Sequence, residues 1–204
     1  MATRIGEIIE SATLTYVAGS YTLLAAPAFG ALVLAHTQDS QVQIYGVVTD
    51  VRTLSREPGG RAIVRGQSYS GRELYNEQIY QAHPDLKEVL QTEFSVWVLG
   101  YRRGDTVVQR VPHFPAPVHY TVEHADVDAV RAFATDFGYL RMLIAAQHLP
   151  ADELMAALIR SMMQVAPEGA HAYALRAGKA LTTLLREDFD RARHILANLR
   201  SDFD

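Results

Sequence analysis

Apolar residues change their spacing once along this chain of 204 residues, near position 125. Before that point they form short runs, rich in Val, Ile, Tyr and Thr and separated by Gly, Pro or Asp, at positions 5–9, 32–34, 42–51, 94–98 and 107–108. Alternating β-branched and aromatic residues are typical of half-buried strands. About five or six short strands within roughly 120 residues favour a small closed β-barrel, because closure leaves no sheet edge exposed.

The middle of the chain predicts how this barrel ends. Residues 92–100 (TEFSVWVLG) and 106–111 (TVVQRV) have the pattern of two strands, and the turn YRRGD at 101–105 joins them. The segment PHFPAPVHY at 112–120 follows, and its prolines restrict the backbone. We expect the hairpin to close the barrel and the proline segment to carry the chain to a second domain.

After position 125 the apolar residues follow a helical period. The first stripe has steps of three and four and consists of Val127, Val130, Phe133, Phe137, Leu140 and Ile144. Asp126 stands before it as an expected N-cap. Similar stripes at 154–165, 173–184 and 189–203 predict further helices, and short connections favour antiparallel neighbours. We therefore expect a compact bundle of about four helices.

The predicted fold class is α+β, with a barrel over residues 1–124 and a helical bundle over residues 125–204. An insertion at 52–91 interrupts the barrel pattern, and its first part is rich in arginine: Arg52, Arg56, Arg61, Arg65 and Arg72. Gly59 and Gly60 make this part a predicted flexible loop, and the later part is expected to be partly helical around residues 85–90.

Composition limits the classes of function. The formal net charge is −4, which argues against a general polyanion binder but leaves room for a local basic patch. Absence of cysteine excludes disulfides, thiolate zinc sites and a cysteine nucleophile. The first residues, MATRIGEIIES, carry charges and do not form a signal peptide, and we expect no membrane span and a cytoplasmic protein.

Several short segments in a fixed order resemble a known domain. These are RIGEII at 4–9, YGVVTDV at 45–51, TEF at 92–94 with VLGY at 98–101, and the proline segment at 112–117. Together they resemble the HAS barrel, a domain named for its occurrence in HerA-type DNA translocases and in ATP synthase catalytic-type subunits. The resemblance implies a barrel that helps to arrange subunits of a hexameric motor and, in HerA-like proteins, to receive a partner nuclease.

The motor that such a barrel precedes needs a P-loop, G-x-x-x-x-G-K-[S/T]. Gly178 and Lys179 form the only Gly-Lys pair in the sequence, but Ala180 stands where the hydroxyl residue belongs and Tyr173 replaces the first glycine. The chain is therefore not expected to hydrolyse ATP by that route, and the bundle takes the place of the motor.

No residue pattern indicates an enzyme. His113, His119 and His124 lie near the predicted barrel exit, but in an extended segment their side chains are too far apart or on opposite faces for one metal ion. Carboxylate pairs at helical spacing are typical of a solvated helix face, and no serine stands in a G-x-S-x-G motif. We therefore expect no catalytic residue, no metal and no cofactor.

The sequence leads to two functional hypotheses. The first is a non-enzymatic assembly or adaptor module in DNA processing, which docks on itself or on a HerA-like ATPase or nuclease. Its candidate docking residues lie in the hairpin turn and the proline segment: Arg102, Arg103, Pro112, Phe114 and Pro115. The prolines have two interpretations, an exposed polyproline ligand with an aromatic anchor or a stiff connection between the domains, and stiffening is favoured.

The alternative hypothesis is direct nucleic-acid binding by the loop between Arg52 and Arg72. Arg56, Arg61 and Arg65 would contact phosphates, and the tyrosines that follow would stack on bases. On the overall charge we favour arginines that pair with acids elsewhere on the protein, so nucleic acid is a possible partner but not the favoured one. A barrel that encloses a small ligand is a third possibility, which predicts a deep apolar pocket.

Overall fold

The computed structural model describes residues 3–67, 71 and 73–199. Within them, seven strands precede residue 125: β1 (Arg4–Ser11), β2 (Thr15–Ser20), β3 (Leu32–His36), β4 (Val42–Ser55), β5 (Leu90–Arg103), β6 (Thr106–Val108) and β7 (Thr121–His124). Two short helices, α1 (Glu77–Ala82) and α2 (Leu86–Val89), interrupt this series. Five more follow it: α3 (Val127–Phe133), α4 (Gly138–Ile144), α5 (Ala151–Met163), α6 (Ala170–Leu184) and α7 (Phe189–Ala197).

Six of the described strands form a closed antiparallel β-barrel, in the circular order β1–β2–β5–β4–β3–β7. The ring closes where β2 pairs with β5 and where β1 pairs with β7. The prediction of a closed barrel is confirmed, but only the first strand of the predicted closing hairpin takes part, because β5 pairs with β2. Among the described strands, β6 pairs only with β5 and extends the sheet outside the ring, and β7 completes the ring between β1 and β3.

Each central strand is buried on both faces, since the barrel is filled inside and covered outside. On β3, Val33 and Ala35 face the barrel interior, while Leu32 and Leu34 belong to the core shared with the helices. The same alternation places Val96 and Val98 inside and Leu99 outside. The interior core consists of Ile5, Ile8, Tyr16, Ala18, Val33, Ala35, Ile44, Val48, Phe94, Val96, Val98, Ala116 and Val122. Side chains thus fill the barrel.

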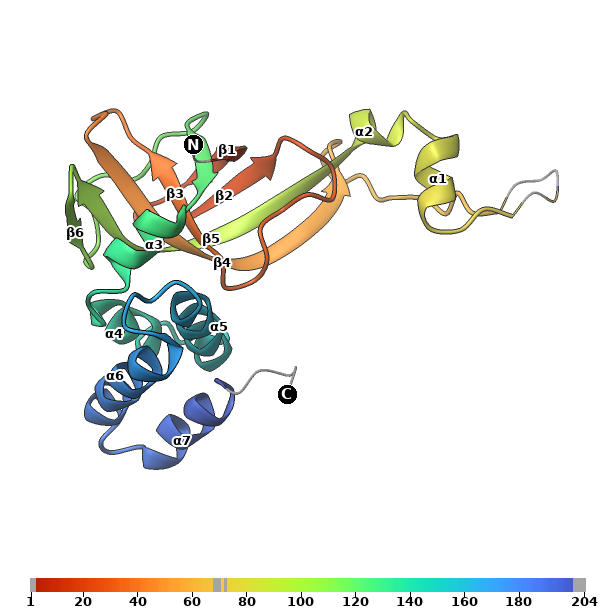
Figure 1. Cartoon of the computed structure of the whole chain (residues 1–204). Coiled ribbons are helices and arrows are strands. Elements are labelled where there is room, and N and C mark those ends of the chain that lie inside the picture. Colours follow the sequence, from red (N-terminus) through yellow and green to blue (C-terminus); the bar gives the residue numbers. More distant parts are fainter. Residues whose placement is uncertain (1–2, 68–70, 72, 200–204) are drawn as a thin grey trace.

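Strands β4 and β5 are far longer than the short strands that the sequence pattern predicted. Each spans 14 residues, and they remain paired from Val42 with Arg103 to Ser55 with Leu90. Their far ends leave the barrel as a ribbon that carries α1 and α2, and Figure 1 shows this arm projecting away from the rest of the molecule. The prediction that Arg52 lies in a flexible loop is therefore wrong. It lies in a strand, because its backbone is paired with Glu93.

The C-terminal helices pack against the outside of the barrel. Their core joins barrel residues to apolar residues of α3 to α7, and Tyr45 lies at its centre with its ring 4.8 Å from that of Phe133. The Tyr45 hydroxyl donates a hydrogen bond to the carbonyl of Ala129 at 3.1 Å. The two parts of the molecule thus share one apolar layer.

The predicted number of C-terminal helices is too low. Residues 127–144 form two described helices, α3 and α4, where the apolar stripe predicted one. The break at residues 134–137 is held by Gln109, whose side chain bonds to the last turn of α3 and to the first of α4. The expected N-cap is confirmed, because Asp126 accepts a hydrogen bond from Ala129 N at 2.9 Å. Helix α7 ends at Ala197, and Phe203 of the last predicted stripe lies outside the described residues.

Candidate docking groove

A groove of about 880 Å³ lies at the rim where β5 and β6 leave the barrel. We call it the docking groove, and these residues line it: Thr37, Gln38, Asp39, Val42, Tyr101, Arg103, Thr106, Val108, Pro112, His113, Phe114, Pro115 and Pro117. They come from three places in the sequence, namely the β3–β4 turn, the β5–β6 hairpin and the proline segment.

The floor of the docking groove is one face of the sheet formed by β4, β5 and β6. Tyr101 lies directly opposite Val108, and Arg103 lies opposite both Thr106 and Val42. Residues paired in this way point to the same side of a sheet, as do residues two apart on one strand. The short strand β6 therefore contributes a surface to the molecule although it stands outside the barrel ring.

The wall of the docking groove is the proline segment. Its ends are fixed, because Pro112 is buried and the carbonyl of the buried Ala116 accepts a hydrogen bond from the Ser11 hydroxyl at 2.5 Å. Between them, Phe114 is 80% exposed, although it is a large apolar side chain. A segment held at both sides presents this ring to solvent at little further entropic cost, which is the property of a binding anchor.

A single ion pair crosses the rim of the docking groove. Arg103 Nη2 donates to Asp39 Oδ2 at 3.0 Å, and the backbone N–H of Gln41 donates to Asp39 Oδ1 at the same distance. The hydrogen bond from Gln41, together with that from Arg103, lowers the pKa of the Asp39 carboxyl from its ordinary value. The carboxylate stays charged and fixes the guanidinium at the edge of an otherwise largely apolar surface.

This arrangement is suited to binding. Its chemistry is an exposed aromatic ring, a few apolar side chains and a neutralised charge pair, which is the composition of a protein-binding surface. Among the described residues, no group of three or more His, Asp or Glu side chains is placed to hold a metal ion.

Four of the five residues predicted for docking line this groove: Arg103, Pro112, Phe114 and Pro115. The fifth, Arg102, points to the other face of β5, where its Nε donates to Gln43 Oε1 at 2.7 Å. Sequence reasoning missed Asp39 and Tyr101. Tyr101 could have been found, since it alternates with Arg103 on the same strand, but Asp39 is 64 residues away from its partner and has no local signal.

The arginines predicted to bind nucleic acid lie on the arm, and most of them are already bonded to other groups of the protein. Arg65 forms an ion pair with Asp85 at 2.9 Å, and Arg56 Nε donates to the carbonyl of Leu90 at 3.2 Å. Arg61 is exposed and has no ion-pair partner among the described residues. Arg52 pairs with Glu93 at 2.9 Å. Arg72 lies outside the described residues.

Sequence comparison agrees with the barrel topology. Residues 5–104 match the family of the HAS barrel domain. This chain contains a HAS barrel. The barrel as folded extends beyond the matched residues, because its ring is completed by β7 at Thr121–His124. No curated protein matches the chain.

The HAS barrel is associated with HerA-type translocases, but the described residues show no ATPase core. The one Gly-Lys pair, Gly178 and Lys179, lies in the interior of α6, where no phosphate-binding loop can form. None of the described helices is long and apolar enough to cross a membrane.

Proposed function

We propose that this protein is a non-enzymatic assembly or adaptor module in DNA processing, which binds a second protein through the docking groove. The partner is a HerA-like ATPase, the nuclease that works with it, or a second copy of this chain. The observation that carries the proposal is Phe114, which stands 80% exposed on a segment fixed at both sides, next to a groove of about 880 Å³.

Two features of the HAS barrel support this proposal. The groove is built from the hairpin and the proline segment, and both lie at one open rim of the barrel where a partner can approach. The helices cover another part of the barrel wall and leave that rim accessible (Figure 1). An aromatic anchor beside apolar side chains and an ion pair is the usual centre of a protein–protein contact.

The proposal is tested by mixing the purified chain with a purified HerA-type ATPase, with its nuclease, and with neither. Size-exclusion chromatography with light scattering should show a complex with one of them or a self-association of the chain. Phe114→Asp should weaken that association by about thirtyfold, which corresponds to about 2 kcal/mol for an aromatic anchor. Phe189→Asp is the matched control, because Phe189 is 66% exposed on α7 and is not part of the groove.

The proposal fails if the chain remains monomeric and binds neither protein. It also fails if Phe114→Asp and Phe189→Asp affect the association equally, since the docking groove would then have no special part in it.

Direct nucleic-acid binding by the arm is the alternative function. In its favour, the arm projects from the barrel (Figure 1), and it carries Arg61, which is exposed. Against it, Arg52 and Arg65 already have carboxylate partners, and each phosphate contact would have to replace such a pair. The adaptor function therefore has the better support.

A further inference from the structure

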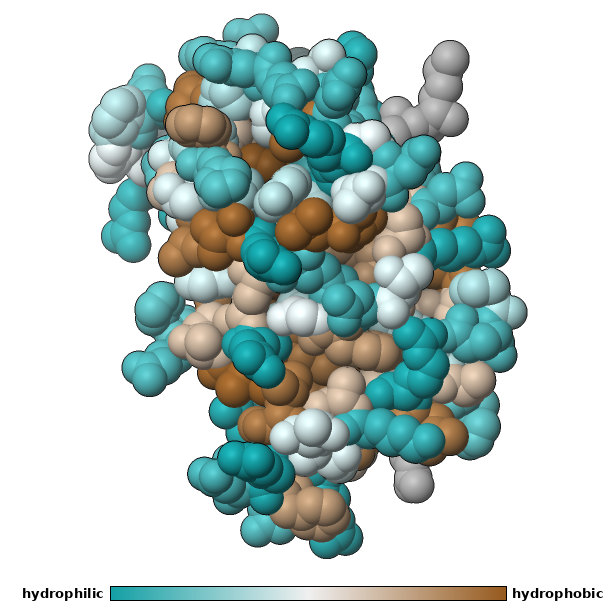
Figure 2. All heavy atoms as spheres, turned by 90° about the vertical axis from the view of Figure 1, so that its left-hand side faces the viewer, coloured by the Kyte–Doolittle hydropathy of each residue, from teal (hydrophilic) through white to brown (hydrophobic). Residues whose placement is uncertain are grey.

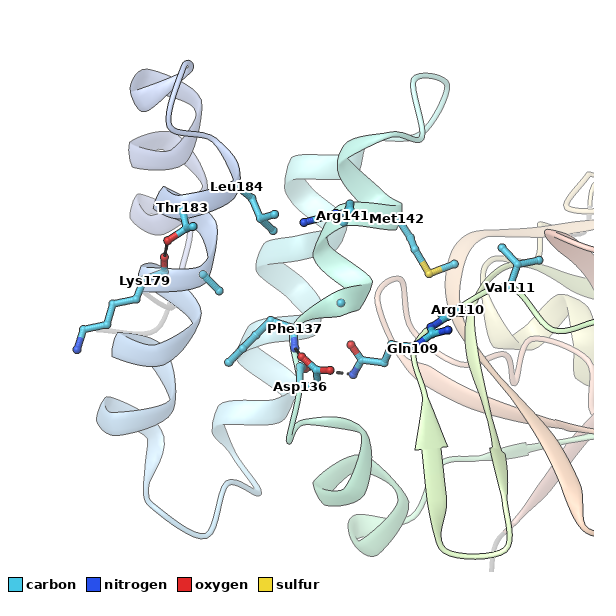
Figure 3. A pocket seen from close by; sticks show the side chains of 12 residues that line it. Gln109, Arg110, Val111, Asp136, Phe137, Arg141, Met142, Lys179, Thr183 and Leu184 are labelled. Atoms are coloured by element: carbon cyan, nitrogen blue, oxygen red, sulfur yellow. Dashed lines mark hydrogen bonds between the residues drawn. The ribbon is translucent and has the colours of Figure 1, made fainter.

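A second groove, distinct from the docking groove, lies where the barrel exit meets the helices. It measures about 820 Å³, and we call it the basic groove. One wall is formed by the residues after β6, a second by the start of α4 and a third by α6, as Figure 3 shows. Its lining consists of Gln109, Arg110, Val111, Asp136, Phe137, Gly138, Arg141, Met142, Lys179, Ala180, Thr183 and Leu184.

The basic groove collects positive charge that the rest of the molecule does not neutralise. Most basic side chains of the described residues have a carboxylate partner or a hydrogen bond. Those with neither among the described residues are Arg61, Lys87, Arg110, Arg141, Lys179 and Arg193. Three of these six, Arg110, Arg141 and Lys179, line this one groove. On a chain with a net charge of −4, this concentration is not expected from composition.

The groove supplies little negative charge of its own. Asp136 is its only acidic lining residue, and its Oδ1 already accepts a hydrogen bond from the backbone N–H of Phe137 at 2.6 Å. In Figure 3, Arg141 lies between α4 and α6 beside Leu184, Arg110 lies on the barrel side, and the Lys179 stem leads outward at the rim. A negatively charged ligand in the groove would meet Arg110 from the barrel side and Arg141 from α4, with Lys179 at the outer rim.

The remaining surface of the basic groove is apolar. Val111, Phe137, Met142 and Leu184 contribute side chains from the three walls. Figure 2 shows hydrophobic residues on this side of the molecule, at the level where the barrel meets the helices, with hydrophilic residues around them. Phe137 is held in place, because its ring stands 5.5 Å from that of Tyr173 and the Arg176 guanidinium lies 5.3 Å above it.

The walls of the basic groove are fixed to one another. Gln109, which belongs to the barrel exit, bonds to the backbone on both sides of the α3–α4 turn. Gly138 packs directly against it, so that a Cβ at Gly138 would lie 3.2 Å from Gln109 Oε1. A groove whose walls are locked in this way does not need to order itself when a ligand binds.

We propose that the basic groove binds an acidic, amphipathic peptide segment of a partner protein. Its carboxylates face Arg110 and Arg141, and its apolar side chains cover Phe137, Met142 and Leu184. A nucleic acid is the poorer fit, because the floor is mainly aliphatic and offers only Phe137 for base stacking. A peptide with acidic and apolar residues matches both the charge and the surface of the groove.

The test uses the full chain and a fluorescein-labelled helical peptide with glutamates on one face and leucines and a phenylalanine on the other. Fluorescence anisotropy should show binding that weakens as salt rises, because exposed charges are screened within about 10 Å at 0.1 M salt. Arg110→Glu with Arg141→Glu should weaken binding by about tenfold or more. Lys87→Glu with Arg193→Glu is the control of equal charge, since both residues are unpaired, exposed and outside the groove.

Circular dichroism should show that both double variants remain folded, because the four side chains are exposed. The proposal is overturned if the peptide does not bind. It is also overturned if the two double variants lose equal affinity, because net charge alone would then determine the binding. It is also overturned if a single-stranded oligonucleotide binds more tightly than the peptide and loses affinity with Arg110→Glu and Arg141→Glu. Phe114→Asp should leave peptide binding unchanged, so that failure of the docking groove and failure of the basic groove are separate results.

Discussion

Gln109 accepts a hydrogen bond from the backbone N–H of Tyr139 at 2.9 Å, through the same amide group that donates to two carbonyls on the other side of the turn. Its Nε2 donates to Phe133 O at 2.7 Å and to Asp136 O at 3.1 Å. One side chain from the barrel exit thus satisfies the end of α3 and the beginning of α4, which would otherwise leave backbone groups without partners.

Gln109→Ala should therefore destabilise the protein more than a surface substitution does. Three hydrogen bonds are lost, partly buried backbone groups lose their partners, and we expect the free energy of unfolding to fall by about 2–3 kcal/mol. Urea unfolding followed by circular dichroism measures this change. Gln147→Ala is the control, because Gln147 is exposed and makes no side-chain hydrogen bond with the described residues. Equal stability of the two variants would contradict the role of Gln109.

Gly46→Ala should loosen the barrel. A Cβ at this position would lie 2.3 Å from Val96 Cγ1 and 3.2 Å from the Trp97 carbonyl, where β4 and β5 change register. Overpacking of this kind costs about 1–3 kcal/mol, and the shift of the urea midpoint measures it. Gly178→Ala in α6 should be neutral or stabilising by up to about 1 kcal/mol, because its Cβ would meet only Leu196 at 3.4 Å or more.

The protein should lose stability above about pH 10, because of its buried tyrosines. Burial raises the pKa of Tyr173 from 10.0 to about 12, and it also raises that of Tyr139. The unfolded chain releases these protons first, so the stability is complete below pH 10 and decreases as the pH rises towards 12, by on the order of 1 kcal/mol per pH unit for each group.

Tyr173→Phe tests this explanation. It removes one buried hydroxyl, together with its hydrogen bond to Met162 Sδ at 2.9 Å, and should make the loss of stability at alkaline pH less steep. Urea unfolding across the alkaline range measures the slope. Tyr21→Phe should leave the slope unchanged, since Tyr21 is exposed. An unchanged slope in Tyr173→Phe would show that this hydroxyl is not the group responsible.

Substitution of the arm arginines should have little effect on nucleic-acid binding. Of the three residues in the combined variant Arg56→Ala, Arg61→Ala and Arg65→Ala, Arg65 is paired with Asp85 and Arg56 is held by a hydrogen bond to the backbone, so only Arg61 has neither kind of contact among the described residues. Anisotropy with a labelled single-stranded oligonucleotide at low and high salt should give the same weak binding for variant and parent. A large loss that depends steeply on salt would instead support the nucleic-acid hypothesis.

Sequence reasoning found the strands that carry strong apolar alternation and missed two that do not. β1, β3, β4 and β5 are rich in Ile and Val and were predicted near their places. β2 (Thr15–Ser20) contains small residues, and β7 (Thr121–His124) is short and polar at its end. β7 pairs with β1 and β3, and β2 pairs with the distant β5 as well as with its neighbour β1. Intrinsic β-propensity is weak evidence for a strand whose conformation depends on such pairing. The closed barrel could be predicted, but the pairings of β2 and β7 that complete its ring could not.

The docking groove was predictable in part for a similar reason. Phe114 and the prolines could be recognised as candidates from their residue types, and Arg103 from its place in the hairpin turn. The register that places Arg103 beside Val42, and the ion pair with Asp39, depend on contacts between distant segments. The basic groove has no signal in the sequence, because its walls come from the residues after β6, from the start of α4 and from α6, and they meet only in the folded molecule.

Strands β1 and β7 are neighbours in the ring, although more than a hundred residues separate them. The polypeptide thus enters and leaves the cylinder at adjoining strands, and the ring is complete at His124. The helices that follow cover Leu32, Leu34, Tyr45 and Leu99 on the outside of the wall, so a chain cut after His124 would expose an apolar flank to water.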